Sequence, residues 1–126
     1  MRTETLLISV ALAAAVATPA ASQRAEIGYP RGSLAYKAIL GQAYGEAETR
    51  LTSEVRVPRD DPARLINLAH VLAKTGRSDQ AARLYQRVMI LEDMELILAD
   101  GRVMSSREAA GRGLRSLAAP ARAPQR

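Results

Sequence analysis

The sequence of 126 residues contains no cysteine, no phenylalanine and no tryptophan, and it has a single histidine. Without a thiol the chain can form no disulfide, no thiolate nucleophile, no thiolate metal site and no lipid-modified cysteine. The lone His70 gives a metal site too few ligands. The sequence also has no glycine-rich phosphate loop and no Gly-x-Ser-x-Gly elbow. We therefore expect neither an enzyme nor a metal or cofactor site.

Alanine and leucine are the abundant apolar residues, and the four tyrosines are the only aromatic side chains besides that histidine. Straight-chain and small residues of this kind favour helices, whereas strands prefer β-branched and aromatic residues. A chain of this length forms one small domain. The composition therefore predicts a mostly all-α fold.

Residues 1–22 have the pattern of a secretory signal peptide. A short polar start with Arg2 precedes an apolar run from Leu6 to Ala17, and small residues follow. The run is shorter than the roughly 20 apolar residues that a membrane-spanning helix needs. Cleavage after Ala20 and cleavage after Ser22 both fit the pattern. We expect an exported protein that is periplasmic or secreted.

The formal net charge of +5 is concentrated at the C-terminal end. Between residues 23 and 101, eleven Lys and Arg are balanced by eleven Asp and Glu, whereas residues 102–126 carry six Arg against Glu108 alone. Two interpretations stay open. This basic end either attaches the protein to an anionic membrane surface or an acidic partner, or it only keeps the chain soluble. The candidate basic residues are Arg107, Arg112, Arg115 and Arg122. No aromatic residue is interleaved with them for base stacking, which argues against nucleic acid as a partner.

A period of 34 residues runs through the middle of the chain. The equivalent positions are Leu34 and Leu68, Ala47 and Ala81, and Leu51 and Tyr85. A fixed period is typical of helical arrays, whose units bury their apolar faces against one another. The spacing predicts two units, residues 28–61 and 62–95.

The second unit has the pattern of a helical hairpin. Asp61 suits an N-cap, and Pro62 suits the first helical position. Two apolar stripes at helical spacing follow, one on either side of Gly76. They consist of Leu65, Leu68, Ala69 and Leu72 before the glycine, and of Ala81, Leu84, Tyr85 and Val88 after it.

This second unit resembles the tetratricopeptide repeat. That family has the same period, with a large-x-x-Leu-small pattern in the first helix and Ala-x-x-x-aromatic in the second. The matching residues are Leu65, Leu68, Ala69, Leu72, Gly76, Ala81 and Tyr85. The first unit matches less well, because Arg31 stands where a large apolar residue is expected and Ala38 is small. In this family the first helices of successive units line a concave groove, so the resemblance implies a non-enzymatic adaptor for a protein or peptide.

The resemblance also implies a binding site. Asn67, His70 and Lys74 lie off the apolar stripe and share one helix face. By the resemblance, Asn67 would hold the backbone of a peptide and Lys74 a carboxylate, with His70 between them and Tyr36 of the first unit beside them. The alternative is that this face is only solvated.

Residues 96–118 predict a β-hairpin and a capping helix. Asp100 and Gly101 are expected to form a two-residue hairpin turn. Ser105 and Glu108 make a capping-box pattern that opens a helix to about Ala118. Its apolar face consists of Ala110, Leu114 and Leu117. We expect this helix to cover the open edge of the second unit, because two repeats alone are marginal. The Pro-rich tail, residues 119–126, is expected to be disordered.

Overall fold

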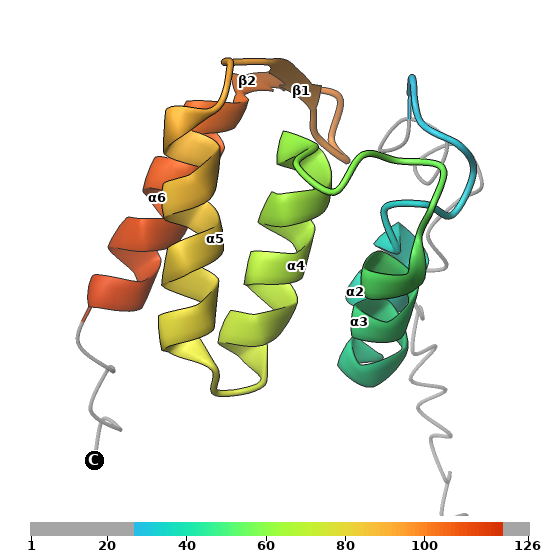
Figure 1. Cartoon of the computed structure of the whole chain (residues 1–126), viewed down its shortest axis with the longest axis horizontal. Coiled ribbons are helices and arrows are strands. Elements are labelled where there is room, and N and C mark those ends of the chain that lie inside the picture. Colours follow the sequence, from blue (N-terminus) through green and yellow to red (C-terminus); the bar gives the residue numbers. More distant parts are fainter. Residues whose placement is uncertain (1–26, 120–126) are drawn as a thin grey trace, which may run out of the picture.

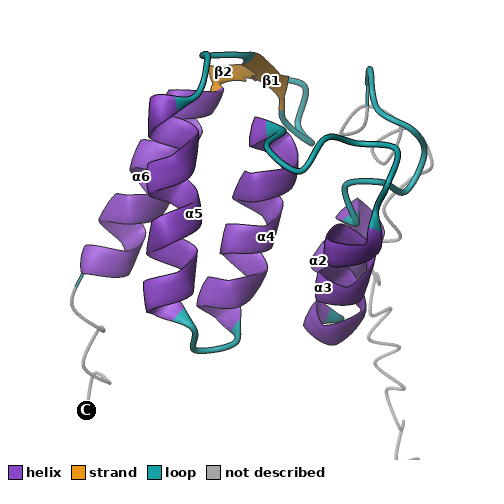
Figure 2. Ribbon diagram, in the orientation of Figure 1, coloured by secondary structure: helices purple, strands orange, loops and turns teal. Residues whose placement is uncertain are grey.

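The computed structural model describes residues 27–119, and helices make up 58% of this range (Figure 2). The elements are α2 (Tyr36–Leu40), α3 (Tyr44–Ser53), α4 (Pro62–Lys74), α5 (Ser78–Ile90), β1 (Glu95–Ile97), β2 (Val103–Ser105) and α6 (Ser106–Ala118). The prediction of a mostly helical chain with a small β-hairpin is confirmed. The expected signal segment, residues 1–22, and all but Ala119 of the expected tail lie outside the described residues. Within residues 27–119, every helix is too short or too polar to cross a bilayer.

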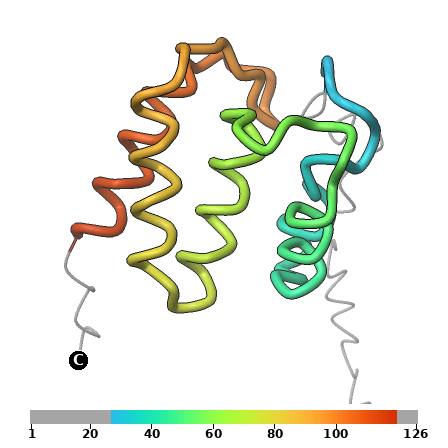
Figure 3. Tube along the Cα trace, viewed as in Figure 1, coloured from blue at the N-terminus to red at the C-terminus, as the bar shows by residue number. Residues whose placement is uncertain are grey.

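The helix α4 lies in the middle of the helical layer, with α5 and α6 on one side and α2 and α3 on the other (Figure 1). Figure 1 shows α4, α5 and α6 standing side by side, with α2 and α3 on the far side of α4. The hairpin of β1 and β2 joins the upper ends of α5 and α6 and extends over the N-terminal end of α4 (Figures 1 and 3). The hairpin therefore covers one end of the helical layer.

The second unit forms the expected helical hairpin. The Asp61 carboxylate accepts a hydrogen bond from the Arg64 backbone N–H at 3.0 Å, and Pro62 occupies the first turn. Gly76 has a φ of 79°, which a residue with a side chain rarely adopts, and α5 begins two residues later. The main core lies between α4, α5 and α6 and consists of Leu65, Ala69, Leu72, Ala81, Tyr85, Val88 and Ala110.

The 34-residue period holds for the second helix of each unit. The helices α3 and α5 begin at Tyr44 and Ser78, which are 34 positions apart. Ala47 and Ala81 are both fully buried, and the equivalent Leu51 and Tyr85 are 0% and 5% exposed. Leu51 and Ala47 belong to a second core cluster, completed by Ala35, Ala38 and Val71.

The first helix of the first unit is much shorter than the period predicts. The helix α4 begins at Pro62, which corresponds to position 28, but α2 begins only at Tyr36. Gly32 and Ala35 have φ angles of 78° and 55°, so the chain between them cannot continue a right-handed helix. The expected unit of residues 28–61 is therefore an irregular segment followed by one short helix and one of ordinary length.

The hairpin loop differs from the expected two-residue turn. The Leu98 N–H donates to the Arg102 carbonyl at 2.8 Å, and the Gly101 N–H donates to the Leu98 carbonyl at 2.9 Å. The loop therefore has three residues, Ala99 to Gly101. Gly101 adopts a φ of 83°, as in hairpins that close with a turn followed by a left-handed residue.

The helix α6 starts and packs as the sequence predicts. The Ser105 hydroxyl accepts from the Glu108 N–H at 3.0 Å, and Ala110 is fully buried in the main core. Gly113 lies directly against Tyr85, since a Cβ atom at Gly113 would lie 2.3 Å from Cζ of that ring. The absence of a side chain at this position therefore lets α6 approach α5 closely.

The two glycines of α6 should respond oppositely to alanine. Gly113→Ala should lower the free energy of unfolding by about 1 to 3 kcal/mol, because the new methyl group overlaps the Tyr85 ring. Gly111→Ala is the matched control, since its Cβ would meet only the mobile end of Arg115 at 3.4 Å. Alanine there should raise stability by up to about 1 kcal/mol through helix propensity. Urea denaturation measures both, and equal stabilisation by both variants would contradict the close contact.

Candidate functional site

A groove of about 230 Å³ lies where three parts of the chain meet. Its walls are the segment before α2, the first turns of α4, and β1 with the residues after it. The lining consists of Ile27, Tyr29, Leu34 and Tyr36, of Ala63, Ile66 and Asn67, of the run from Glu95 to Ala99, and of Ala109. Beneath it, Leu34, Ala63 and Leu96 form a third buried cluster.

The groove is mostly apolar and open to solvent. Ile27 and Ile97 line it with 57% and 38% of their surfaces exposed. Glu95 is the only charged side chain among the described residues of the lining. An apolar hollow with a few polar groups is the usual form of a binding site.

The Tyr29 side chain fixes one wall of the groove to α4. Its hydroxyl donates to the Asp61 carboxylate at 3.0 Å, and the same carboxylate caps α4. Burial raises the pKa of Tyr29, and the charge of Asp61 raises it further. The phenol therefore stays protonated and keeps this hydrogen bond across the physiological pH range.

Asn67 lines the groove, but its amide is used within the chain. The Asn67 Nδ2 donates to the Leu34 carbonyl at 2.9 Å. In a continuous helix that carbonyl would accept from the N–H of Ala38, but α2 begins too late for this bond. Asn67 thus satisfies a backbone group that the short α2 leaves unpaired, where the resemblance implied a bond to a ligand.

The four residues expected at the binding site do not come together. Tyr36 and Asn67 both line the groove, whereas His70 and Lys74 lie outside it. The half-buried His70 ring meets the Tyr44 ring edge to face, with centroids 6.4 Å apart. Lys74 is exposed at the C-terminal end of α4.

The arginines of the expected basic patch are partly engaged. The Arg107 guanidinium donates to the Leu91 carbonyl at 2.8 Å, at the C-terminal end of α5. Arg112 forms an ion pair with Glu108 at 2.8 Å. Arg115 is exposed, and Arg122 lies outside the described residues. Two of the three described arginines therefore serve local structure.

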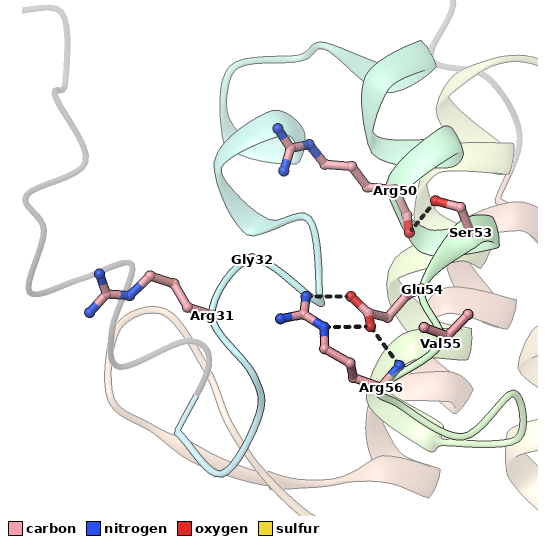
Figure 4. Close-up of a pocket in the computed structure, with 7 residues that line it drawn as sticks. All are labelled: Arg31, Gly32, Arg50, Ser53, Glu54, Val55 and Arg56. Carbon is pink, nitrogen blue, oxygen red and sulfur yellow. Dashed lines mark hydrogen bonds and ion pairs between the residues drawn. The ribbon is translucent and has the colours of Figure 1, made fainter.

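A second hollow, of about 280 Å³, lies beside the C-terminal end of α3 (Figure 4). It is lined by Arg31, Gly32, Arg50, Ser53, Glu54, Val55 and Arg56. Arg56 forms a fork on Glu54 with bonds of 2.9 and 2.7 Å, which lowers the pKa of Glu54 to about 2. Figure 4 shows the guanidinium groups of Arg31 and Arg50 pointing in different directions. The three arginines therefore do not converge on one anion.

The sequence patterns did not reveal the segment before α2 and β1 as walls of a groove. A signal was present, because Ile27 and Tyr29 are large apolar residues that the 34-residue pattern does not require. Their partner across the groove, β1, lies more than 60 positions away in the sequence. No local pattern joins such distant segments.

Asn67→Ala should lower the free energy of unfolding by about 1 to 3 kcal/mol, because the buried Leu34 carbonyl loses its donor. Lys74→Ala, on the same helix but exposed, should change stability by less than about 0.5 kcal/mol. Thermal and urea unfolding of both variants make the comparison. Equal, small changes in stability for the two variants would show that the Asn67 hydrogen bond does not stabilise the fold.

The pKa of His70 should lie below its ordinary value of about 6.5. Burial lowers this pKa, and the charge of Lys74 lowers it further. A lowered pKa means that the neutral form stabilises the fold above about pH 6.5, and that this stability is lost as the pH falls through the folded-state pKa. Because His70 is the only histidine, its ring resonances can be titrated by NMR without ambiguity. A pKa of 6.5 or higher would contradict the burial of the His70 ring.

The chain has no match among protein-family models, among curated proteins or among solved structures. The resemblance to the tetratricopeptide repeat therefore depends on the motif residues and on the spacing of their helices. The apolar groove and the segments that form it are the features from which a function can be argued.

Proposed function

We propose that this protein is a non-enzymatic binding module that holds a protein or peptide segment in the groove between the segment before α2, α4 and β1. The observation that carries the proposal is the exposure of Ile27 and Ile97 on either side of an apolar groove. Apolar side chains held at the mouth of a hollow gain free energy when a partner covers them.

We propose further that the fold is a short tetratricopeptide-like array, with α6 as its cap, and that it works outside the cytoplasm. The 34-residue offset between α3 and α5 supports the array. The burial of Ala110 against α5 supports the capping role. The pattern of residues 1–22 supports export.

The groove is a better site than the polar face of α4 or the basic end of the chain. On α4, His70 and Lys74 lie outside the groove, and Asn67 already holds a backbone carbonyl. At the basic end, Arg107 and Arg112 are engaged in local bonds. Binding through the groove would therefore depend mainly on apolar burial.

Peptides selected from a random phage-displayed library against the purified protein should depend on the groove. The double variant Ile27→Ser and Tyr36→Ser should weaken their binding at least tenfold, about 1.4 kcal/mol, because both side chains line the groove. The matched control is Leu40→Ser with Ile90→Ser. These residues are 49% and 73% exposed and lie outside the groove, so their replacement should leave binding unchanged.

Salt distinguishes the groove from the basic end as the binding surface. Binding that depends on apolar burial should change little between 0.1 and 0.5 M salt, whereas binding through arginines should collapse. Equal affinity of the two double variants, together with collapse at high salt, would refute the groove and favour attachment through the basic C-terminus.

A further inference from the structure

The hydrogen bonds of the hairpin show which backbone groups of β1 point away from β2. The Ser106 N–H donates to the Met94 carbonyl at 2.7 Å, and the Leu98 N–H donates to the Arg102 carbonyl at 2.8 Å. Hydrogen-bonded pairs alternate along an antiparallel ladder, so Leu96 pairs with Met104 between them. The N–H and C=O groups of Glu95 and Ile97 therefore point away from β2.

These outward groups have no partner within the described part of the chain. No backbone or side-chain hydrogen bond among residues 27–119 reaches the main chain of Glu95 or Ile97. The groove lies on this side of the hairpin, because it is lined by the five residues from Glu95 to Ala99 and by none of β2. A free strand edge beside an apolar hollow is the arrangement that accepts an added strand.

We propose that the groove binds an extended peptide as a third strand of the sheet, paired with the free edge of β1. This inference rests on the proposed function of the groove and names the conformation and chemistry of its ligand. The outward N–H and C=O groups of Glu95 and Ile97 form the hydrogen bonds to the peptide backbone.

The two faces of β1 set the side chains that the peptide carries. Leu96 is buried against Leu34 and Ala63, so peptide side chains beside Leu96 point to the groove floor and are apolar. On the opposite face stands the exposed Glu95 carboxylate, the only charge of the described lining. Cross-strand neighbours of opposite charge stabilise a sheet, so Glu95 favours a basic residue there. The ligand is therefore an extended segment with apolar residues on the face beside Leu96 and a basic residue beside Glu95.

The small volume of the groove favours a single extended peptide over the same edge of a second copy. Tyr29 and Tyr36 line the same hollow as β1, and its volume is about 230 Å³. That space takes a few apolar side chains. A folded hairpin would need the whole edge to be open.

The probe is a capped hexapeptide of three Val-Lys repeats, titrated against the full chain. In an added strand, alternate N–H groups point to opposite edges. N-methylation of one alternating set, either all valines or all lysines, should weaken binding at least tenfold, and methylation of the other set should leave it unchanged. The corresponding Val-Glu peptide should bind at least threefold more weakly, because its carboxylates lie beside Glu95.

Two proline variants of the protein test the same strand edge. Ile97→Pro removes an outward N–H of β1 without removing a donor to β2, and it should abolish binding of the Val-Lys peptide. Val103→Pro is the matched control, because Val103 is the cross-strand partner and its outward N–H lies on the β2 edge. This variant should bind as the parent does.

The outcomes separate this inference from the proposed function. Equal tolerance of both methylation patterns, or full binding by Ile97→Pro, would overturn strand addition. The proposed function of the groove would still be supported if the double variant Ile27→Ser and Tyr36→Ser weakens binding of the Val-Lys peptide. If neither the Ile97→Pro variant nor the double serine variant changes peptide binding, the groove is refuted as the binding site as well. A chain that elutes as a dimer, and that the peptide cannot dissociate, would assign the edge to a second copy instead. No binding of the Val-Lys peptide by the parent would also overturn the inference.

Discussion

The close contact between Gly113 and the Tyr85 ring sets the position of α6, and the position of the groove follows from it. With α6 held against α5, its first residue Ser106 is fully buried at the base of the hairpin. The Ser106 hydroxyl donates to Asp93 at 3.1 Å and accepts from the Met94 N–H at 3.0 Å. These bonds fix the direction in which β1 leaves α5. The buried Leu96 then seats β1 against Leu34 and Ala63, which places the strand edge over the groove.

The irregular first unit provides the opposite wall. A full-length first helix would have satisfied the Leu34 carbonyl within its own turns. Because α2 begins late, Asn67 supplies that hydrogen bond and Tyr29 ties the segment to the N-cap of α4. The departure from the repeat thus leaves a segment with exposed apolar side chains facing β1. The same departure that weakens the repeat creates the groove.

Much of the second half of the chain could be predicted from local patterns. The N-caps at Asp61 and Ser105 depend on residues three positions away, and both form where the sequence indicates. The Glu108 carboxylate of the expected capping box pairs with Arg112 instead. The short α2 could not be predicted, because Ala35 keeps the apolar pattern of a helix while its backbone turns left-handed. The close contact at Gly113 could not be predicted, since it depends on a ring 28 positions away. The groove was missed for the same reason, because its walls meet only in three dimensions.

Amide hydrogen exchange of the free protein tests the central claim, that β1 carries a free edge toward the groove, most directly. The Leu98 amide, bonded to Arg102, and the Leu96 amide within the ladder should exchange slowly. The Glu95 and Ile97 amides should exchange at least tenfold faster, because their N–H groups donate to no acceptor among residues 27–119. Such alternation along one short strand is the result that this structure predicts. Uniform protection from Glu95 to Leu98 would mean that the edge is already covered, and it would contradict the account.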